Sequence, residues 1–149
     1  MKTTINVNGE PVEITLTAEQ INKIKGSGKI TDRVKTFSDA CAIAGATPDV
    51  LTLLSTPTAD RNLIASQGHA KLVIIARALN EGWKPDFTNT SQPKYYPWLQ
   101  YSSASGFSYC GYVSTYASAR VGSRLCFKSS ELAKYAAEQF RDIYNEFLG

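Results

Sequence analysis

The chain has 149 residues, of which 43% are hydrophobic and 19% charged, and its formal net charge is +3 at pH 7. A chain of this length can bury about two thirds of its unfolded surface, and its composition excludes an intrinsically disordered protein. The mildly basic balance does not by itself indicate a nucleic-acid-binding protein. We therefore predict one globular domain over residues 1–149.

The first predicted element is a β-hairpin over residues 1–17. Apolar and polar residues alternate on both sides of Asn8-Gly9, a pair that favours a two-residue turn between antiparallel strands. These first residues lack the apolar run of a signal peptide, and the chain has no long apolar segment. We therefore expect a cytoplasmic protein with no membrane partner.

Residues 18–82 are predicted to be mainly helical. Capping and periodicity signals indicate a short helix that ends at Gly26, two more short helices, and a longer helix from Thr58 to Asn80. Gly68 is expected to break or kink the long helix, because glycine lowers helix stability by about 1 kcal/mol relative to alanine. The apolar stripe of that helix consists of Leu72, Ile75, Ala76 and Leu79.

Residues 94–128 differ from the first half because they hold six of the eight tyrosines. Aromatic and β-branched residues separated by Ser-Gly turns predict three antiparallel strands. Apolar residues at helical spacing over residues 130–148 then predict a C-terminal helix that lies on the sheet. The predicted fold class is α+β: an N-terminal β-hairpin, central helices, and a three-stranded antiparallel aromatic-rich sheet backed by a C-terminal helix. The stripe of that last helix is Leu132, Ala136, Phe140, Ile143 and Phe147.

Strand alternation sorts the predicted sheet into two faces. One face, with Leu99, Val113 and Phe127, is expected to pack against the C-terminal helix. The other face combines rings with basic groups, in a segment that has no Asp or Glu between Phe87 and Ser130. The predicted ligand-binding residues on and beside that second face are Tyr96, Trp98, Tyr112, Tyr116, Arg120, Arg124 and Lys128.

Two interpretations of this second face stay open. Other elements of the chain, or a second copy in a homo-oligomer, could cover it, and the tyrosines would then be ordinary packing residues. Alternatively the face is open and binds a nucleotide or nucleic acid, because rings stack on bases for about 1–3 kcal/mol each and Arg and Lys hold phosphate. We take the second interpretation as the functional hypothesis.

Residues for catalysis or metal binding are scarce. His69 is the single histidine, and the three cysteines include no Cys-x-x-Cys pair, so we expect neither a metal site nor a cofactor. A nucleophile pair of Cys41 with His69 is conceivable, but Cys41 lies in a run of small residues that indicates close helix packing. We therefore predict that the chain is not an enzyme.

Four blocks of the sequence resemble an uncharacterised family of short proteins from gut bacteria and their phages. The blocks are "ITDRVKTFSDAC", "ALNEGWKPDF", "KYYPW" and "GSRLCFKSSELAKYAAEQFRDIYNEFL", and the similarity covers about Lys29–Leu148. The family has no established activity, so the resemblance implies only a phage or mobile-element accessory protein. The expected function is non-enzymatic binding of a nucleotide-like or nucleic-acid anion, in a sequestering or anti-defence role. The alternative is a protein–protein module, either a virion component or an inhibitor of a host protein.

Overall fold

Residues 2–7, 10–15, 28–118 and 123–149 are described by the computed structural model, which divides the chain into two units, Met1–Arg33 and Val34–Gly149. The first unit contains antiparallel strands β1 (Lys2–Val7) and β2 (Glu10–Thr15) and a short helix, α2 (Ile30–Arg33). This pairing confirms the two strands predicted for the hairpin. The Asn8-Gly9 turn and the helix expected to end at Gly26 lie outside the described residues.

The second unit begins with three helices: α3 (Phe37–Ala44), α4 (Pro48–Ser55) and α5 (Arg61–Leu79). A capping box starts α3, because the Thr36 side chain accepts the Asp39 N–H and the Asp39 carboxylate accepts the Thr36 N–H. Gly45 ends α3 in the left-handed conformation, with φ of 65°. Within the described residues, no helix combines the length and apolarity needed to cross a membrane.

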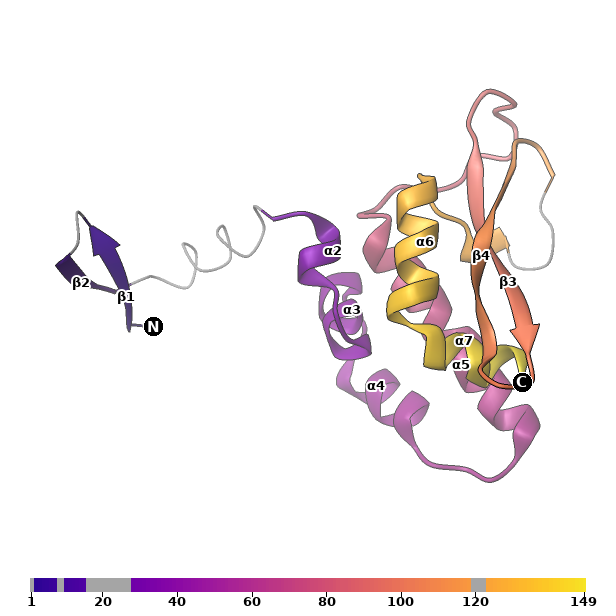
Figure 1. Ribbon diagram of the computed structural model, residues 1–149, viewed down its shortest axis with the longest axis horizontal. Coiled ribbons are helices and arrows are strands. Elements are labelled where there is room, and N and C mark those ends of the chain that lie inside the picture. The colour runs from indigo at the N-terminus through magenta and orange to yellow at the C-terminus, as the bar shows by residue number, and fades with distance from the viewer. Residues whose placement is uncertain (1, 8–9, 16–27, 119–122) are drawn as a thin grey trace. The chain divides into compact units, whose positions relative to one another are not determined.

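The long helix α5 is the centre of the hydrophobic core. Its predicted stripe is confirmed, since every residue of that stripe is buried. The expected break at Gly68 is wrong, because α5 continues through it. A Cβ at Gly68 would lie 2.8 Å from the backbone nitrogen of Phe147, so the missing side chain lets α5 and α7 (Arg141–Leu148) approach closely (Figure 1).

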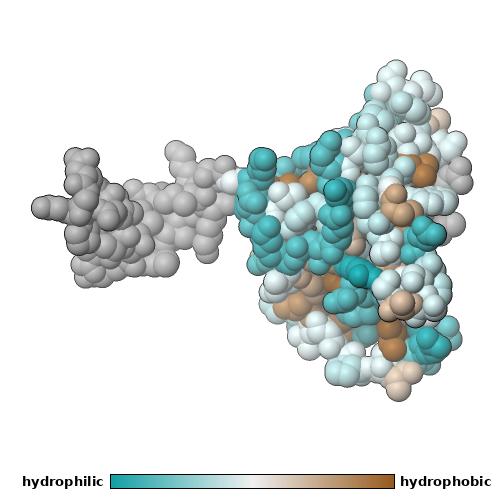
Figure 2. All heavy atoms as spheres, viewed as in Figure 1, coloured by the Kyte–Doolittle hydropathy of each residue, from teal (hydrophilic) through white to brown (hydrophobic). Residues whose placement is uncertain are grey.

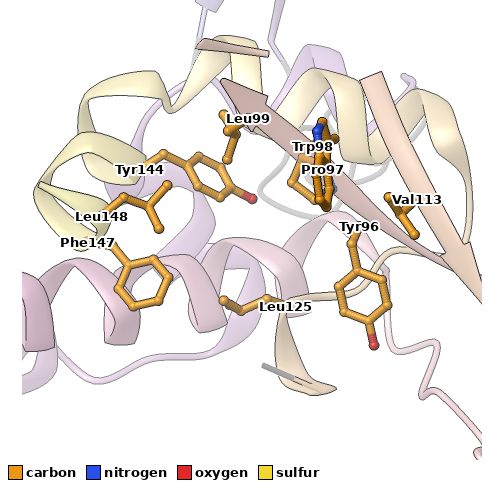
Figure 3. A pocket seen from close by; sticks show the side chains of 9 residues that line it. All are labelled: Tyr96, Pro97, Trp98, Leu99, Val113, Leu125, Tyr144, Phe147 and Leu148. Carbon is orange, nitrogen blue, oxygen red and sulfur yellow. The ribbon is translucent and has the colours of Figure 1, made fainter. Parts of the chain in front are cut away.

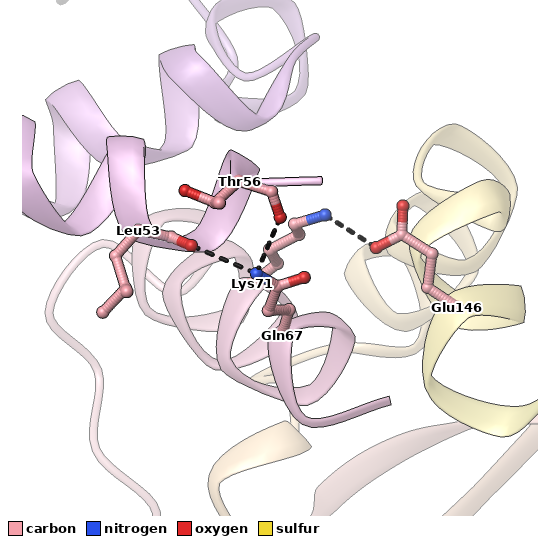
Figure 4. Close-up of polar contacts among 5 residues, drawn as sticks. All are labelled: Leu53, Thr56, Gln67, Lys71 and Glu146. Carbon is pink, nitrogen blue, oxygen red and sulfur yellow. Dashed lines mark hydrogen bonds and ion pairs between the residues drawn. The ribbon is translucent and has the colours of Figure 1, made fainter. Parts of the chain in front are cut away.

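Polar contacts fix the neighbours of α5 in place (Figure 4). The Lys71 Nζ lies 2.7 Å from the Glu146 carboxylate and joins α5 to α7. The Gln67 side-chain amide donates to the carbonyls of Leu53 and Thr56, both at 3.1 Å, at the end of α4. Carbonyls at a helix end lack the usual i+4 donor, and the Leu53 carbonyl otherwise accepts only the Thr56 N–H, at 3.4 Å. Gln67 therefore serves as a tertiary cap for α4.

The aromatic segment forms two strands, and the predicted three-stranded sheet is wrong. Strands β3 (Lys94–Ser102) and β4 (Gly106–Thr115) make a two-stranded antiparallel sheet. The segment predicted as the third strand contains a short 3₁₀ helix, η1 (Ser123–Leu125), and one isolated bridge. The fold class is therefore α+β in broad terms only.

In the described part of the predicted third strand, a single residue, Phe127, pairs with β3. The Tyr95 and Phe127 backbones exchange two hydrogen bonds, at 2.8 and 3.0 Å. On the other edge of this segment, the buried Asn80 amide donates to the Cys126 carbonyl and accepts the Lys128 N–H. The pairing ends there because η1 precedes it and helix α6 (Ser130–Gln139), capped by Ser129, follows at once.

The C-terminal helix predicted over residues 130–148 is two helices. The chain breaks at Phe140, where φ is −112° and ψ is 32°, between α6 and α7. The break turns Tyr144, which is not part of the predicted stripe, into the core. Arg141 and Asn145 then bind the backbone of Phe107 and so attach α7 to the base of the β3–β4 turn.

Helix α6 packs against both strands of the β3–β4 sheet. Leu132, Ala133, Ala136 and Ala137 make its buried side. Its outward side is hydrophilic in Figure 2, where brown atoms appear only in scattered areas, and it carries the exposed residues Lys134 and Glu138. The three small alanine side chains let α6 lie close to the strands, and α7 also contacts β4.

Candidate functional site

The register of β3 and β4 separates the predicted ligand-binding rings. Tyr96 pairs with Val113, whereas Tyr112 pairs with Pro97. Cross-strand partners share a face and neighbouring residues alternate, so Tyr96 and Tyr112 lie on opposite faces of the sheet. The sequence interpretation had placed both rings on one face and Val113 on the other.

Exposure divides the rings differently, because Trp98 shares the face of Tyr96 and is nevertheless exposed. Trp98, Tyr112 and Tyr116 are 55%, 52% and 50% exposed. The Tyr96 hydroxyl is instead shut off from solvent, near the Thr115 hydroxyl but without a hydrogen bond of normal geometry to it. Burial raises the pKa of Tyr96 to about 12. Tyr96 is therefore a packing residue, while the other three rings face outward.

Trp98 and Tyr96 belong to a pocket beside β3, which we call the apolar pocket (Figure 3). Its volume is about 530 Å³, and it lies between the edge of β3, η1 and the end of α7. The lining residues carry no charge, so the pocket does not fit a phosphate. They are Tyr96, Pro97, Trp98, Leu99, Val113, Leu125, Tyr144, Phe147 and Leu148.

A second hollow, which we call the basic cleft, has a different character. Its volume is about 600 Å³, and it is formed by the end of α5, the loop at residues 82–87 and η1. Arg77, Lys84 and Arg124 supply three positive charges, and Trp83 and Phe87 supply two rings. Among the residues that the structure describes, no Asp or Glu lines it. The remaining lining residues are Val73, Asn80, Gly82, Pro85, Ser123 and Cys126.

Of the two predicted basic residues that the structure describes, Arg124 lines this cleft and Lys128 does not. Lys128 is exposed and forms an ion pair with Glu81 at 3.1 Å. Arg120 lies outside the described residues. The structure thus separates the predicted set: Trp98 and Tyr96 border the apolar pocket, and Arg124 borders the basic cleft.

The loop that carries Phe87 is organised by a buried lysine. Lys94 is 0% exposed, and its Nζ donates to the backbone carbonyls of Asp86, Asn89, Gln92 and Tyr116 at 2.5–3.1 Å. The same Nζ lies 5.3 Å from the centre of the Phe87 ring. Lys94 therefore holds the loop at one wall of the basic cleft, and its charge is not available to a ligand.

The candidate catalytic residues stay apart from both hollows. Cys41 is buried in α3, and burial raises the pKa of its thiol, which makes it a poor nucleophile. His69 lies inside α5 with its ring 5.3 Å from that of Phe147. Neither residue lines the apolar pocket or the basic cleft, and the described ranges contain no cluster of three His, Cys, Asp or Glu that could hold a metal ion.

Sequence reasoning missed the basic cleft because its residues come from three separate segments. Arg77 lies on α5, Lys84 on the following loop and Arg124 on η1. A local signal was present in "EGWKPDF", where two aromatic residues flank a lysine in a Pro-containing loop. That pattern indicates a surface loop with anchoring rings, but not that two arginines lie opposite it.

No protein-family model, curated protein or solved structure matches the chain.

Proposed function

We propose that the chain is a non-enzymatic accessory protein of the phage or mobile-element type that binds a nucleotide-like or nucleic-acid anion in the basic cleft. One observation carries the proposal. Three basic residues, Arg77, Lys84 and Arg124, line one hollow together with Trp83 and Phe87, and the described lining residues include no carboxylate. The site therefore differs from the predicted sheet face, while the chemistry of the ligand is the same.

The residue types suit the two halves of a nucleotide. Arg guanidinium groups bind phosphate oxygens in a bidentate manner, and Lys adds a point charge. An aromatic ring that stacks on a base contributes about 1–3 kcal/mol. The volume of about 600 Å³ lies within the range of about 300–1,000 Å³ that is usual for small-molecule sites.

Internal contacts support a site that is formed before the ligand arrives. The Arg77 Nη2 donates to the Ala44 carbonyl at 2.7 Å, which fixes its guanidinium while leaving other N–H groups to donate. Asn80 holds the backbone beside Cys126, and Lys94 holds the loop of Phe87. Ordering these groups in advance lowers the entropic cost of binding.

Such a protein would act by occupancy. Sequestration of a signalling nucleotide in the host cytoplasm requires affinity and abundance, but no nucleophile, base or metal. An anti-defence role of this kind suits an accessory protein of a phage, and it makes the concentration of the free ligand the quantity that the protein changes.

A second candidate function rests on the exposed rings of the hairpin. Trp98, Tyr112 and Tyr116 are at least half exposed, as is Tyr101 at 63%. Tyr and Trp are enriched in the energetic centres of protein interfaces. The hairpin would then bind a host or phage protein, or a second copy of the chain, as the main activity.

Titration with AMP, a cyclic mononucleotide, ATP and a short oligothymidine tests the first proposal. We expect binding that weakens several-fold when salt rises from about 50 to about 300 mM, because charge–charge attraction is screened. Arg124→Gln and Lys84→Gln should each weaken binding about tenfold, while Lys134→Gln on the outward side of α6 should not.

The outcomes separate the two candidates. If none of these ligands binds, or if Arg124→Gln binds as well as the unchanged chain, the nucleotide proposal is wrong. If instead a host or phage protein is retained at about 300 mM salt and is lost in Trp98→Ala and Tyr112→Ala, the interface candidate is the better one. Size-exclusion chromatography with light scattering reports whether the partner is a second copy.

A further inference from the structure

The apolar pocket is separate from the basic cleft, and no residue lines both. Its volume of about 530 Å³ is also in the range of ligand sites. Rings and branched aliphatic side chains surround it from β3, β4, η1 and α7 (Figure 3). The pocket therefore needs an occupant of a different chemical class from the one proposed for the cleft.

One polar group points into this apolar space. Tyr144 is 4% exposed, and its ring extends from α7 toward β3 with the hydroxyl among the other lining side chains (Figure 3). Within the described part of the chain, the hydroxyl has no hydrogen-bond partner. A phenol is protonated at neutral pH, and burial raises the pKa of Tyr144 further above its ordinary value, so the hydroxyl can donate. A donor without a partner at the wall of a pocket is a ready contact for an acceptor on a ligand.

The edge of β3 explains why the pocket is open. The Tyr95 N–H and C=O point away from β4 and pair with Phe127. Two residues further along, Pro97 faces the same edge, and it has no N–H to offer. The pairing is an isolated bridge, so the strand that would cover Pro97 and Leu99 is missing, and both residues line the pocket.

We infer that the apolar pocket is a second binding site, for a neutral fused-ring molecule that accepts a hydrogen bond from the Tyr144 hydroxyl. The molecule is neutral because no lining residue carries a charge. It is flat and apolar because the rings of Tyr96, Trp98 and Phe147 offer it faces and edges. It carries an acceptor because the phenol is a donor whose partner is missing.

Three related compounds test this inference with the full chain. They are naphthalene, 2-acetylnaphthalene and naphthalene-2-sulfonate, followed through the NMR signals of the Val113 and Leu125 methyl groups, which line the pocket. We expect 2-acetylnaphthalene to bind about 3–10 times more tightly than naphthalene, which is the range of one neutral hydrogen bond. The sulfonate should bind most weakly, because its charge would lose its water without gaining a cation.

Tyr144→Phe removes only the hydroxyl oxygen and is the matched variant. It should reduce the affinity for 2-acetylnaphthalene to that for naphthalene and leave naphthalene binding unchanged, an effect that a merely structural role would not produce. If this variant does not fold, Leu148→Trp at the rim should abolish binding of all three compounds by filling the pocket. The inference is overturned if no compound shifts these methyl signals or if the sulfonate binds as tightly as 2-acetylnaphthalene. It is also overturned if Tyr144→Phe leaves the ratio of the affinities for 2-acetylnaphthalene and naphthalene unchanged, or if Leu148→Trp leaves binding intact.

Discussion

Replacing Lys94 by methionine removes the ammonium group from its four backbone carbonyls while keeping a side chain of similar length. Lys94 is fully buried, and its Nζ is the shared donor for the carbonyls of Asp86, Asn89, Gln92 and Tyr116. The perturbation is therefore local, and it tests whether this one charge organises the loop between α5 and β3.

The expected loss of stability follows from the number of carbonyls that lose their only donor. The Asp86 and Asn89 carbonyls also accept the N–H groups of Asn89 and Gln92, both at 3.3 Å, so they keep a donor after the substitution. Two carbonyls that keep no donor cost about 1–3 kcal/mol each, and part of this is offset because the variant has no ammonium to desolvate. We expect the free energy of unfolding to fall by about 2–4 kcal/mol, which lowers the Tm by roughly 10–15 °C in a unit of this size.

Urea unfolding of Lys94→Met, followed by circular dichroism, measures this loss, with Lys134→Met as the control. Lys134 is exposed, and its nearest carboxylate is 3.9 Å away in an i,i+4 pair, so its replacement should cost less than about 0.5 kcal/mol. A loss below about 1 kcal/mol for Lys94→Met would refute the reasoning, because it would mean that the four carbonyls find water without help from the lysine.

Three further predictions concern the packing and titration of the second unit. Gly68→Ala should lower the free energy of unfolding by about 1–2 kcal/mol, although alanine favours helix, because its Cβ would clash with the backbone of Phe147. A higher stability in urea unfolding would contradict the close approach of α5 and α7. Thr36→Ala should cost about 1 kcal/mol by removing the cap that accepts the Asp39 N–H, and an unchanged unfolding midpoint would count against that cap. The pKa of folded Tyr96 is about 12 against an ordinary value of 10, so its contribution to the free energy of unfolding is complete below pH 10 and is lost between pH 10 and 12. The free energy of unfolding should therefore fall less between pH 10 and pH 12 in Tyr96→Phe than in the unchanged chain. Equal losses in the two proteins would contradict the burial of Tyr96.

Periodic signals in the sequence predicted the helices well because one helix face must meet the core. The stripe of α5 is such a case, and every residue in it is buried. Gly68 shows the limit of the same reasoning. The sequence gives the cost of a glycine in a helix, but only the tertiary structure shows that Phe147 approaches so closely that glycine is required.

The sheet was harder to predict because a single residue changes the face of every side chain that follows. Cys110 is the extra residue at the β-bulge opposite Trp98 and Leu99, and the register pairs Tyr96 with Val113. The third strand looked convincing in "GSRLCFK", yet its pairing with β3 ends after Phe127. Hydrophobic alternation indicates an extended segment, but it does not say how many of its residues find a partner.

The basic cleft and the role of Lys94 depend on contacts between distant segments. Arg77 and Arg124 are far apart in sequence, and they line the same cleft because α5 and η1 are in contact. Lys94 counted among the positive charges of an acid-free segment, but its ammonium is consumed by backbone carbonyls. Composition correctly indicated that residues 87–130 are positively charged, but it could not show which of the cations remain available to a ligand.

The measurement that tests the central claim most directly is an NMR titration of the full chain with ATP at low salt, followed through the Trp83 indole N–H and the Arg124 Nε–H. We expect saturable shifts of both signals, and these shifts should weaken as salt is added. In Arg124→Gln, the shift of the Trp83 indole signal should disappear. Shifts confined to the Trp98 indole, or no shift at either tryptophan, would contradict the proposal that the basic cleft binds a nucleotide-like anion.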